Sequence, residues 1–226
     1  LFNCLSSAKA QSANYPFCTI DAQQGQISVP DERLNKLAEL VKPGRIVPAT
    51  CDIVDIAGLV KGASQGEGLG NQFLGNIRET DAIIHVLRCF DNDNIVHVDG
   101  SVNPVRDKEI IDAELQLKDL ETVENRIKRV EKQARVGGDK QAKLEFDVLS
   151  AYRDALLQGK SARTVTFETE DEIATAKGLF LLTTKPVLYV CNVDDTSAAN
   201  GNPYVEAVRE AIKDEDAELL IISAQT

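Results

Sequence analysis

Residues 52–73 read DIVDIAGLVKGASQGEGLGNQF, and the rest of the chain can be understood from them. The segment opens with a short apolar run that predicts a β-strand, and this run ends at Asp55. Gly58 follows three residues later. The spacing suits a nucleotide site, because the carboxylate can hold Mg²⁺ directly or through water while the glycine lets a backbone N–H approach a terminal phosphate. An ordinary Asx turn at a strand end would explain the same two residues, since short motifs often match by chance.

Glycines dominate the residues that follow. Gly62, Gly66, Gly68 and Gly70 leave this part of the chain little helix propensity. Such a composition is typical of a loop that becomes ordered only when a ligand binds. The neighbouring glycines therefore favour a nucleotide site over a simple turn.

The composition describes a globular chain able to bury a sizeable core. Of its 226 residues, 43% are hydrophobic and 27% are charged, which is usual for one or two domains. The net charge of −11 argues against a protein that binds nucleic acid through a positive field over its whole surface, but it is compatible with a local basic patch. We expect no signal peptide and no membrane partner, because no apolar run approaches the roughly 20 residues of a membrane span. Five cysteines without metal-ligand spacing, with Cys51 and Cys191 in expected buried strands, predict reduced thiols and a cytoplasmic protein.

The segment at 52–73 and two others resemble a known family. The match is carried by residues 55–73, by NIRETDA at 76–82 and by NYPFCTI at 14–20, and it extends from Leu1 to Ala224. These segments closely resemble the YchF family of Obg-like ATPases within the P-loop GTPase class. The resemblance implies an α/β fold of the P-loop NTPase (Ras-like) type, with a mostly parallel sheet that lacks its first strand and an inserted antiparallel helical hairpin.

The resemblance also implies that the chain is a fragment of a longer protein. In the family, a phosphate loop ending in Gly-Lys-Ser/Thr directly precedes the helix expected at residues 1–10, and a TGS domain follows the last strand. The phosphate loop supplies backbone N–H groups, a phosphate-binding lysine and one Mg²⁺ ligand. We therefore expect the chain by itself to be an inactive part of an ATPase or GTPase.

Two continuous apolar runs predict the central strands of the sheet. Residues 82–87 and 187–191 have strand length, and such runs indicate strands covered on both faces, as in a parallel sheet. Residues 169–172 fit a capping box, which predicts a helix from about residue 170 to residue 182.

Between these strands the chain has a helical period. Apolar residues recur every three or four positions over 109–135 and again over 144–158, and a glycine pair separates the two series. The pattern predicts an antiparallel helical hairpin at 107–160. The hairpin would divide the nucleotide-binding domain into a first part at 1–106 and a second part at 161–226.

Basic residues gather near the expected tip of the hairpin, against the acidic background of the chain. They are Arg126, Lys128, Arg129, Lys132, Arg135, Lys140 and Lys143. A solvated helical face with ion pairs one turn apart would account for them. A contact patch for RNA or the ribosome is the other interpretation, and the family's association with translation makes the ribosome a candidate partner.

The strand expected at 187–191 delivers Asn192, Val193 and Asp195 at its carboxyl end, the edge where open α/β sheets bind ligands. GTPases carry Asn-Lys-x-Asp at this point, and the aspartate accepts hydrogen bonds from guanine. The resemblance implies that these residues surround the base together with Ser223 and Ala224. YchF proteins lose the lysine, as this chain does, but they usually place glutamate last. Asp195 therefore leaves ATP and GTP open as substrates, and we favour ATP because the rest of the chain matches the ATP-preferring family.

The resemblance also implies a metal site and a catalytic group. Thr19 matches the Mg²⁺-coordinating threonine, although by sequence alone it would start a strand, and Asp55 would hold the metal through water. The N–H of Gly58 would lie near the γ-phosphate. Leu59 follows, where Ras-like enzymes place a water-orienting glutamine, and an aliphatic side chain cannot hydrogen-bond a water. The polar group must then come from elsewhere, and the family's candidate is a loop histidine that matches His97, for which ordinary loop solvation is the alternative.

Three functions fit these residues. The leading hypothesis is the core of a Mg²⁺-dependent ATPase that serves as a YchF-like switch associated with the ribosome. The second is a GTPase of the Obg type. The third is a non-hydrolysing interaction module that uses the hairpin as an adaptor, with nucleotide only structural or lost.

Overall fold

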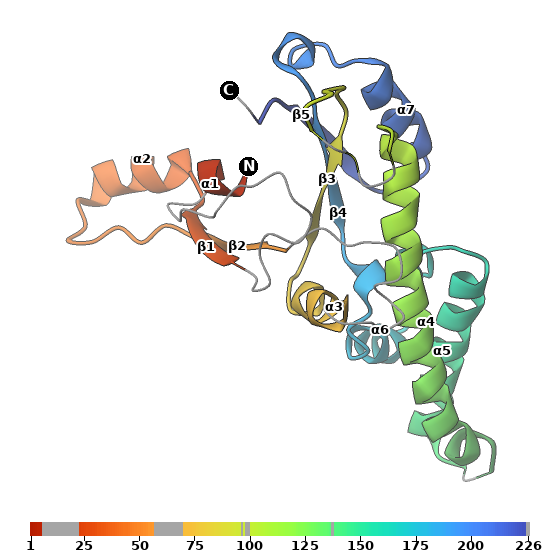
Figure 1. Cartoon of the computed structure of the whole chain (residues 1–226). Coiled ribbons are helices and arrows are strands. Elements are labelled where there is room, and N and C mark those ends of the chain that lie inside the picture. The colour runs from red at the N-terminus through yellow and green to blue at the C-terminus, as the bar shows by residue number, and fades with distance from the viewer. Residues whose placement is uncertain (6–22, 57–69, 96, 98–99, 137, 225–226) are drawn as a thin grey trace. The chain divides into compact units, whose positions relative to one another are not determined.

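The structure is a computed structural model, and it describes residues 1–5, 23–56, 70–95, 97, 100–136 and 138–224 (Figure 1). The chain divides into two compact units, Leu1–Gly58 and Leu59–Thr226, and each unit is described by itself.

The first unit is built on an antiparallel pair of strands. It holds helices α1 (Phe2–Leu5) and α2 (Glu32–Val41) and strands β1 (Gln23–Ser28) and β2 (Thr50–Asp55). In this pair Gln23 lies opposite Asp55 and Ser28 lies opposite Thr50. Cys51 is exposed, so the prediction that it is buried is wrong. The reason is that β2 belongs to a two-stranded pair and not to a sheet covered on both faces.

The second unit contains the parallel sheet that the apolar runs predict. Its strands are β3 (Ile83–Arg88), β4 (Val187–Asn192) and β5 (Glu218–Ile222), in the order β3-β4-β5. All pairings are parallel, so the three carboxyl ends lie at one edge of the sheet. Helix α7 (Pro203–Ala211) connects β4 to β5 and contributes Val205 and Val208 to the core of the sheet.

The helical hairpin is present where the period predicts it. Helix α4 (Pro104–Val136) has 33 residues, so it is about 50 Å long at 1.5 Å per residue. Helix α5 (Lys140–Leu157) begins at the N-cap Asp139 and returns beside α4 (Figure 1). The two helices pack through a stripe of buried residues that the apolar period marks. This stripe contains Val123, Ile127, Val130, Val148, Leu149, Tyr152 and Leu156.

Helix α6 (Glu170–Lys177) starts at the predicted capping box, in which Thr169 and Glu172 bond to each other's backbone N–H groups. The predicted end near residue 182 is wrong, because the helix stops at Gly178 and a 3₁₀ turn, η3 (Leu182–Thr184), follows. The buried carboxylate of Asp119 on α4 accepts hydrogen bonds from the backbone N–H groups of Leu182 and Thr183, with N···O distances of 2.7 Å. These N–H groups are thereby removed from helical hydrogen bonding.

The remaining elements are short. They are α3 (Gly70–Arg78), η2 (Ala162–Thr164) and η4 (Asp195–Ser197). Among the described helices, none is both long and apolar enough to cross a membrane.

Candidate functional site

The carboxyl ends of β4 and β5 bring together the residues predicted to surround a base. The side-chain oxygen Oδ1 of Asn192 accepts a hydrogen bond from the N–H of Ala224 at 3.1 Å. The N–H of Val193 donates to the carbonyl of Ile222 at 2.9 Å. These bonds join the segment after β4 to the segment after β5. Val193 is only 3% exposed and packs in the core of the sheet, so its side chain anchors this edge to the core.

The two aspartates that follow have different partners. Asp194 caps the 3₁₀ turn η4, and hydrogen bonds from Thr196 and Ser197 lower the pKa of its carboxyl below the usual value. Asp195 instead accepts a hydrogen bond from the hydroxyl of Ser223. Local capping therefore occupies Asp194, while a contact between distant segments orients Asp195.

The carboxyl end of β3 leads into a loop that is held by side chains. The guanidinium of Arg88 donates to the carbonyls of Phe90, Asn92 and Ile95 at 3.0–3.2 Å and lies over the Phe90 ring. From α7, Tyr204 donates its hydroxyl hydrogen to Asp91 at 2.9 Å. The loop before His97 is therefore fixed to the sheet and to α7.

His97 contacts the beginning of α4. Its Nε2 lies 2.9 Å from Oδ2 of Asp107, and the two side chains are 15% and 22% exposed. Oδ1 of Asp107 accepts hydrogen bonds from Nε and Nη2 of Arg106. His97 is thus part of a charged cluster between a loop and a helix.

The residues predicted to contact phosphate and metal, Thr19, Asp55 and Gly58, all belong to the first unit. Thr19 and Gly58 lie outside the described residues. Asp55 is the last residue of β2 in the first unit, and its carboxylate forms no ion pair or hydrogen bond with the residues that the structure describes. No cluster of three acidic, histidine or cysteine side chains suited to a metal occurs within the described ranges.

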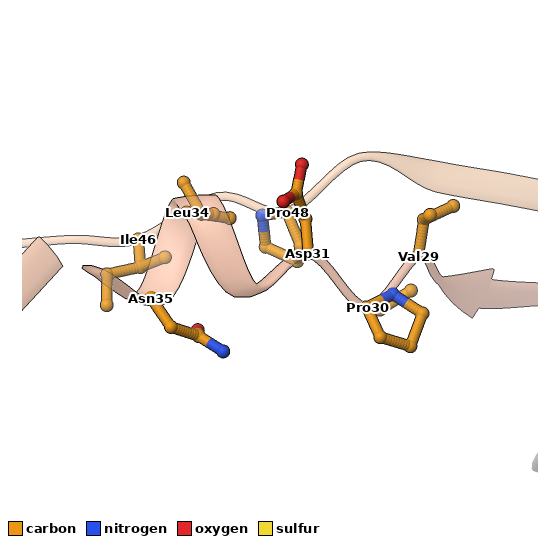
Figure 2. A pocket seen from close by; sticks show the side chains of 8 residues that line it. Val29, Pro30, Asp31, Leu34, Asn35, Ile46 and Pro48 are labelled. Atoms are coloured by element: carbon orange, nitrogen blue, oxygen red, sulfur yellow. The ribbon is translucent and has the colours of Figure 1, made fainter. Parts of the chain in front are cut away.

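A hollow of about 230 Å³ lies in the first unit. Figure 2 shows its lining, which comes from the end of β1, the first turn of α2 and the returning segment at 46–48. Its charged group, Asp31, is the N-cap of α2 and pairs with Arg33 at 2.8 Å. The hollow contains none of the predicted site residues, so we assign no function to it.

Sequence reasoning did not identify Arg88, Asp107 or Arg106. Each acts through a contact with a loop or with a neighbouring side chain, and nothing in the helical period or the strand patterns marks such a contact. The signal that could have found Asp107 is its place in the first turn of a long helix, directly after the loop that carries His97.

The family model described as 50S ribosome-binding GTPase matches residues 1–136 of the chain. The chain is 52% identical over 227 residues to the protein named Ribosome-binding ATPase YchF of Bacillus subtilis (strain 168). This match covers 100% of this chain and 62% of that protein. It is 50% identical over 224 residues to the protein of the same name from Escherichia coli O157:H7, covering 99% of this chain and 61% of that protein. Among solved structures, the YchF GTPase of Schizosaccharomyces pombe is similar with a TM-score of 0.75 and 37% identity, covering 93% of this chain and 58% of that chain.

The chain thus spans 62% and 61% of the length of these two curated relatives. The match to the solved structure confirms the P-loop GTPase fold for the parallel sheet and its helices. The chain belongs to the 50S ribosome-binding GTPase family and, within it, to the YchF proteins.

Proposed function

We propose that the chain carries the nucleotide-binding residues of a Mg²⁺-dependent ATPase that acts as a ribosome-associated switch. The observation that carries the proposal is the cluster at the carboxyl edge of β4 and β5, where Asn192 bonds to Ala224 and Asp195 bonds to Ser223. This is the edge where open α/β sheets bind ligands. The names of the Bacillus subtilis and Escherichia coli relatives support ATP as the substrate and the ribosome as the partner.

In this proposal the cluster holds the base, and three residues earlier in the chain have the metal and phosphate roles. Asp55 and Thr19 would provide oxygen ligands for Mg²⁺, and the N–H of Gly58 would face the γ-phosphate. The exposed Asp55 carboxylate fits this role, because Mg²⁺ takes oxygen ligands and usually keeps several waters beside one or two carboxylates. Bound Mg²⁺ would neutralise negative charge on the phosphates.

Competition between nucleotides tests the base. We expect unlabelled ATP to displace a labelled nucleotide from the full-length protein at a lower concentration than GTP does. A specific observation keeps an Obg-type GTPase as the second candidate: Asp195 presents a carboxylate, which can accept from guanine N1–H, whereas adenine N1 has no hydrogen to donate. Displacement at a lower GTP concentration would favour that second candidate.

Replacing His97 with alanine tests the catalytic group. In the full-length protein we expect the turnover rate to fall about 10²-fold, the scale of a lost proton-transfer group, with nucleotide affinity nearly unchanged. Asn94→Ala, an exposed substitution in the same loop, is the control. Unaltered turnover in His97→Ala would remove His97 from the mechanism.

The third hypothesis is a non-hydrolysing adaptor. Leu59 cannot orient a water, so slow intrinsic turnover is expected under either hypothesis. Single-turnover hydrolysis in the presence of ribosomes separates them, since an adaptor would leave the nucleotide intact.

We also propose that the hairpin, residues 107–160, is a separate domain that interrupts the nucleotide-binding domain formed by 1–106 and 161–226. Between residues 126 and 143 the hairpin carries seven basic and two acidic side chains, in a chain whose net charge is −11. All seven basic side chains are exposed. Such a local patch fits ribosomal RNA phosphates, and a ribosomal partner would place the protein in the cytoplasm.

A further inference from the structure

The contact between His97 and Asp107 constrains the imidazole ring. The carboxylate has no hydrogen to give, so in a neutral imidazole the nitrogen facing it must carry the proton. That nitrogen is Nε2, at 2.9 Å from Oδ2 of Asp107. Nδ1 is then the nitrogen of His97 that accepts.

Asp107 is itself oriented by its neighbours. Nε and Nη2 of Arg106 donate to Oδ1 at 3.1 and 2.9 Å. Arg106 also donates to the hydroxyl oxygen and the carbonyl oxygen of Ser101, at 3.1 and 2.7 Å. One carboxylate oxygen therefore serves Arg106 and the other serves His97, which fixes the plane of the Asp107 carboxylate.

Lys108, which follows Asp107 in the sequence, anchors the start of α4 in the second unit. Lys108 is 5% exposed, and its Nζ lies 2.7 Å from Asp112 and 2.6 Å from Glu215, the latter in the connection between α7 and β5. Burial lowers the pKa of Lys108, but its hydrogen bonds to Asp112 and Glu215 raise the pKa overall, so the amine stays charged. The Tyr189 hydroxyl on β4 donates to the same Glu215 at 2.8 Å. The helical turn that carries Asp107 is thus tied to the sheet.

We propose that Asp107 is the positioning residue for His97, holding the imidazole in the Nε2–H tautomer so that Nδ1 accepts the proton of the attacking water. The inference rests on the proposed function, in which His97 serves hydrolysis. In that step the water oxygen forms a bond to the γ-phosphorus while the bond from the γ-phosphorus to the β–γ bridging oxygen breaks. The nucleoside diphosphate leaves with the electron pair, and the water proton passes to Nδ1 and then to the released phosphate. Asp107 stabilises the imidazolium present in between.

The tautomer of His97 can be measured without any activity assay. The chain has two histidines, His85 and His97, so long-range ¹H–¹⁵N spectra of the ¹⁵N-labelled chain contain two imidazole patterns, which His97→Ala assigns. We expect the Nε2–H pattern for His97. In Asp107→Asn the new amide can donate as well as accept, so the Nδ1–H form should rise to a comparable population. Asp154→Asn, an exposed acid on α5 with a 3.4 Å ion pair to Arg153, should change nothing.

Turnover of the full-length protein provides the second readout. We expect Asp107→Asn to lower kcat about 10-fold or more with KM little changed, because the wrong tautomer cannot accept the proton. Asp107→Glu, which keeps the carboxylate, should recover part of the loss, and the midpoint of thermal unfolding checks that each variant is folded.

The outcomes separate the inference from the proposed function. An unchanged His97 tautomer in Asp107→Asn would overturn the inference, and so would normal turnover in Asp107→Asn when His97→Ala is slow. Normal turnover in both variants would overturn the catalytic role of His97 and the inference with it. A shifted tautomer together with a lower kcat supports the inference.

Discussion

Replacing Asp119 with alanine should lower the free energy of unfolding of the second unit by about 3–5 kcal/mol. Asp119 is fully buried on α4, and its carboxylate accepts three hydrogen bonds, from the N–H of Leu182 and from the N–H and hydroxyl of Thr183, each at 2.7 Å. Burial raises the pKa of Asp119, and hydrogen bonds from Thr183 and Leu182 oppose the increase. Alanine would leave three buried donors without this acceptor, and each costs about 1–3 kcal/mol when unsatisfied.

Chemical denaturation followed by a probe in the hairpin measures this loss. Glu121→Ala is the matched control, because Glu121 is an acid on the same helix, 52% exposed at its side chain, and paired with Lys118. The control should change the free energy of unfolding by less than about 0.5 kcal/mol, as exposed ion pairs do. A loss below 1 kcal/mol in Asp119→Ala would mean that solvent or another group replaces the carboxylate.

Asp119 also shows why the end of α6 could not be predicted from the sequence. Residues 170–182 contain no proline and start at a capping box, and the next proline is Pro186, so the sequence predicts a helix to about residue 182. In the structure the helix stops at Gly178, and Phe180 takes a left-handed φ of 49° before the buried turn at Leu182. The carboxylate of Asp119, 63 residues earlier in the chain, accepts a hydrogen bond from the N–H group of Leu182. A contact over this distance leaves no mark in a local pattern.

The hairpin, by contrast, was predictable because its stability comes from one continuous stripe. The apolar period marks Val123, Ile127 and Val130 as the buried face of α4, and these residues are buried against α5. Acidic side chains in the same helix look alike in sequence. Glu121 is exposed and Asp119 is fully buried, although they are only two positions apart in the sequence.

The candidate site divides in the same way. Asn192 ends β4, Asp195 lies three residues beyond it, and Ser223 directly follows β5, so strand prediction was enough to place them at one edge. Asp107 lies ten residues after His97, and only the folded loop brings the two side chains within 2.9 Å. Residues carried by strand ends can thus be found from sequence, whereas those that orient a loop side chain need the structure.

Replacing Lys128, Arg129 and Lys132 together with glutamine should weaken binding to purified ribosomes by about 10²–10³-fold at 0.1 M salt. The three side chains are exposed on α4, and they form no ion pair within the described part of the chain. Ile127 and Val130 face α5, and the helical repeat places residues 128, 129 and 132 on the opposite side of α4. If each neutralises one phosphate, each contributes about 10-fold at this salt concentration through released counterions.

A matched triple variant separates the hairpin tip from overall charge. Lys160, Lys177 and Lys213 are exposed bases outside the tip, and replacing them with glutamine changes the net charge by the same amount. This control should bind nearly as the unmodified protein does, and its slope of log affinity against log salt should stay the same. The tip variant should lose about two to three units of that slope, because three phosphate contacts are gone. Equal losses in both variants would indicate a general charge effect, and no loss in the tip variant would show that the partner binds elsewhere.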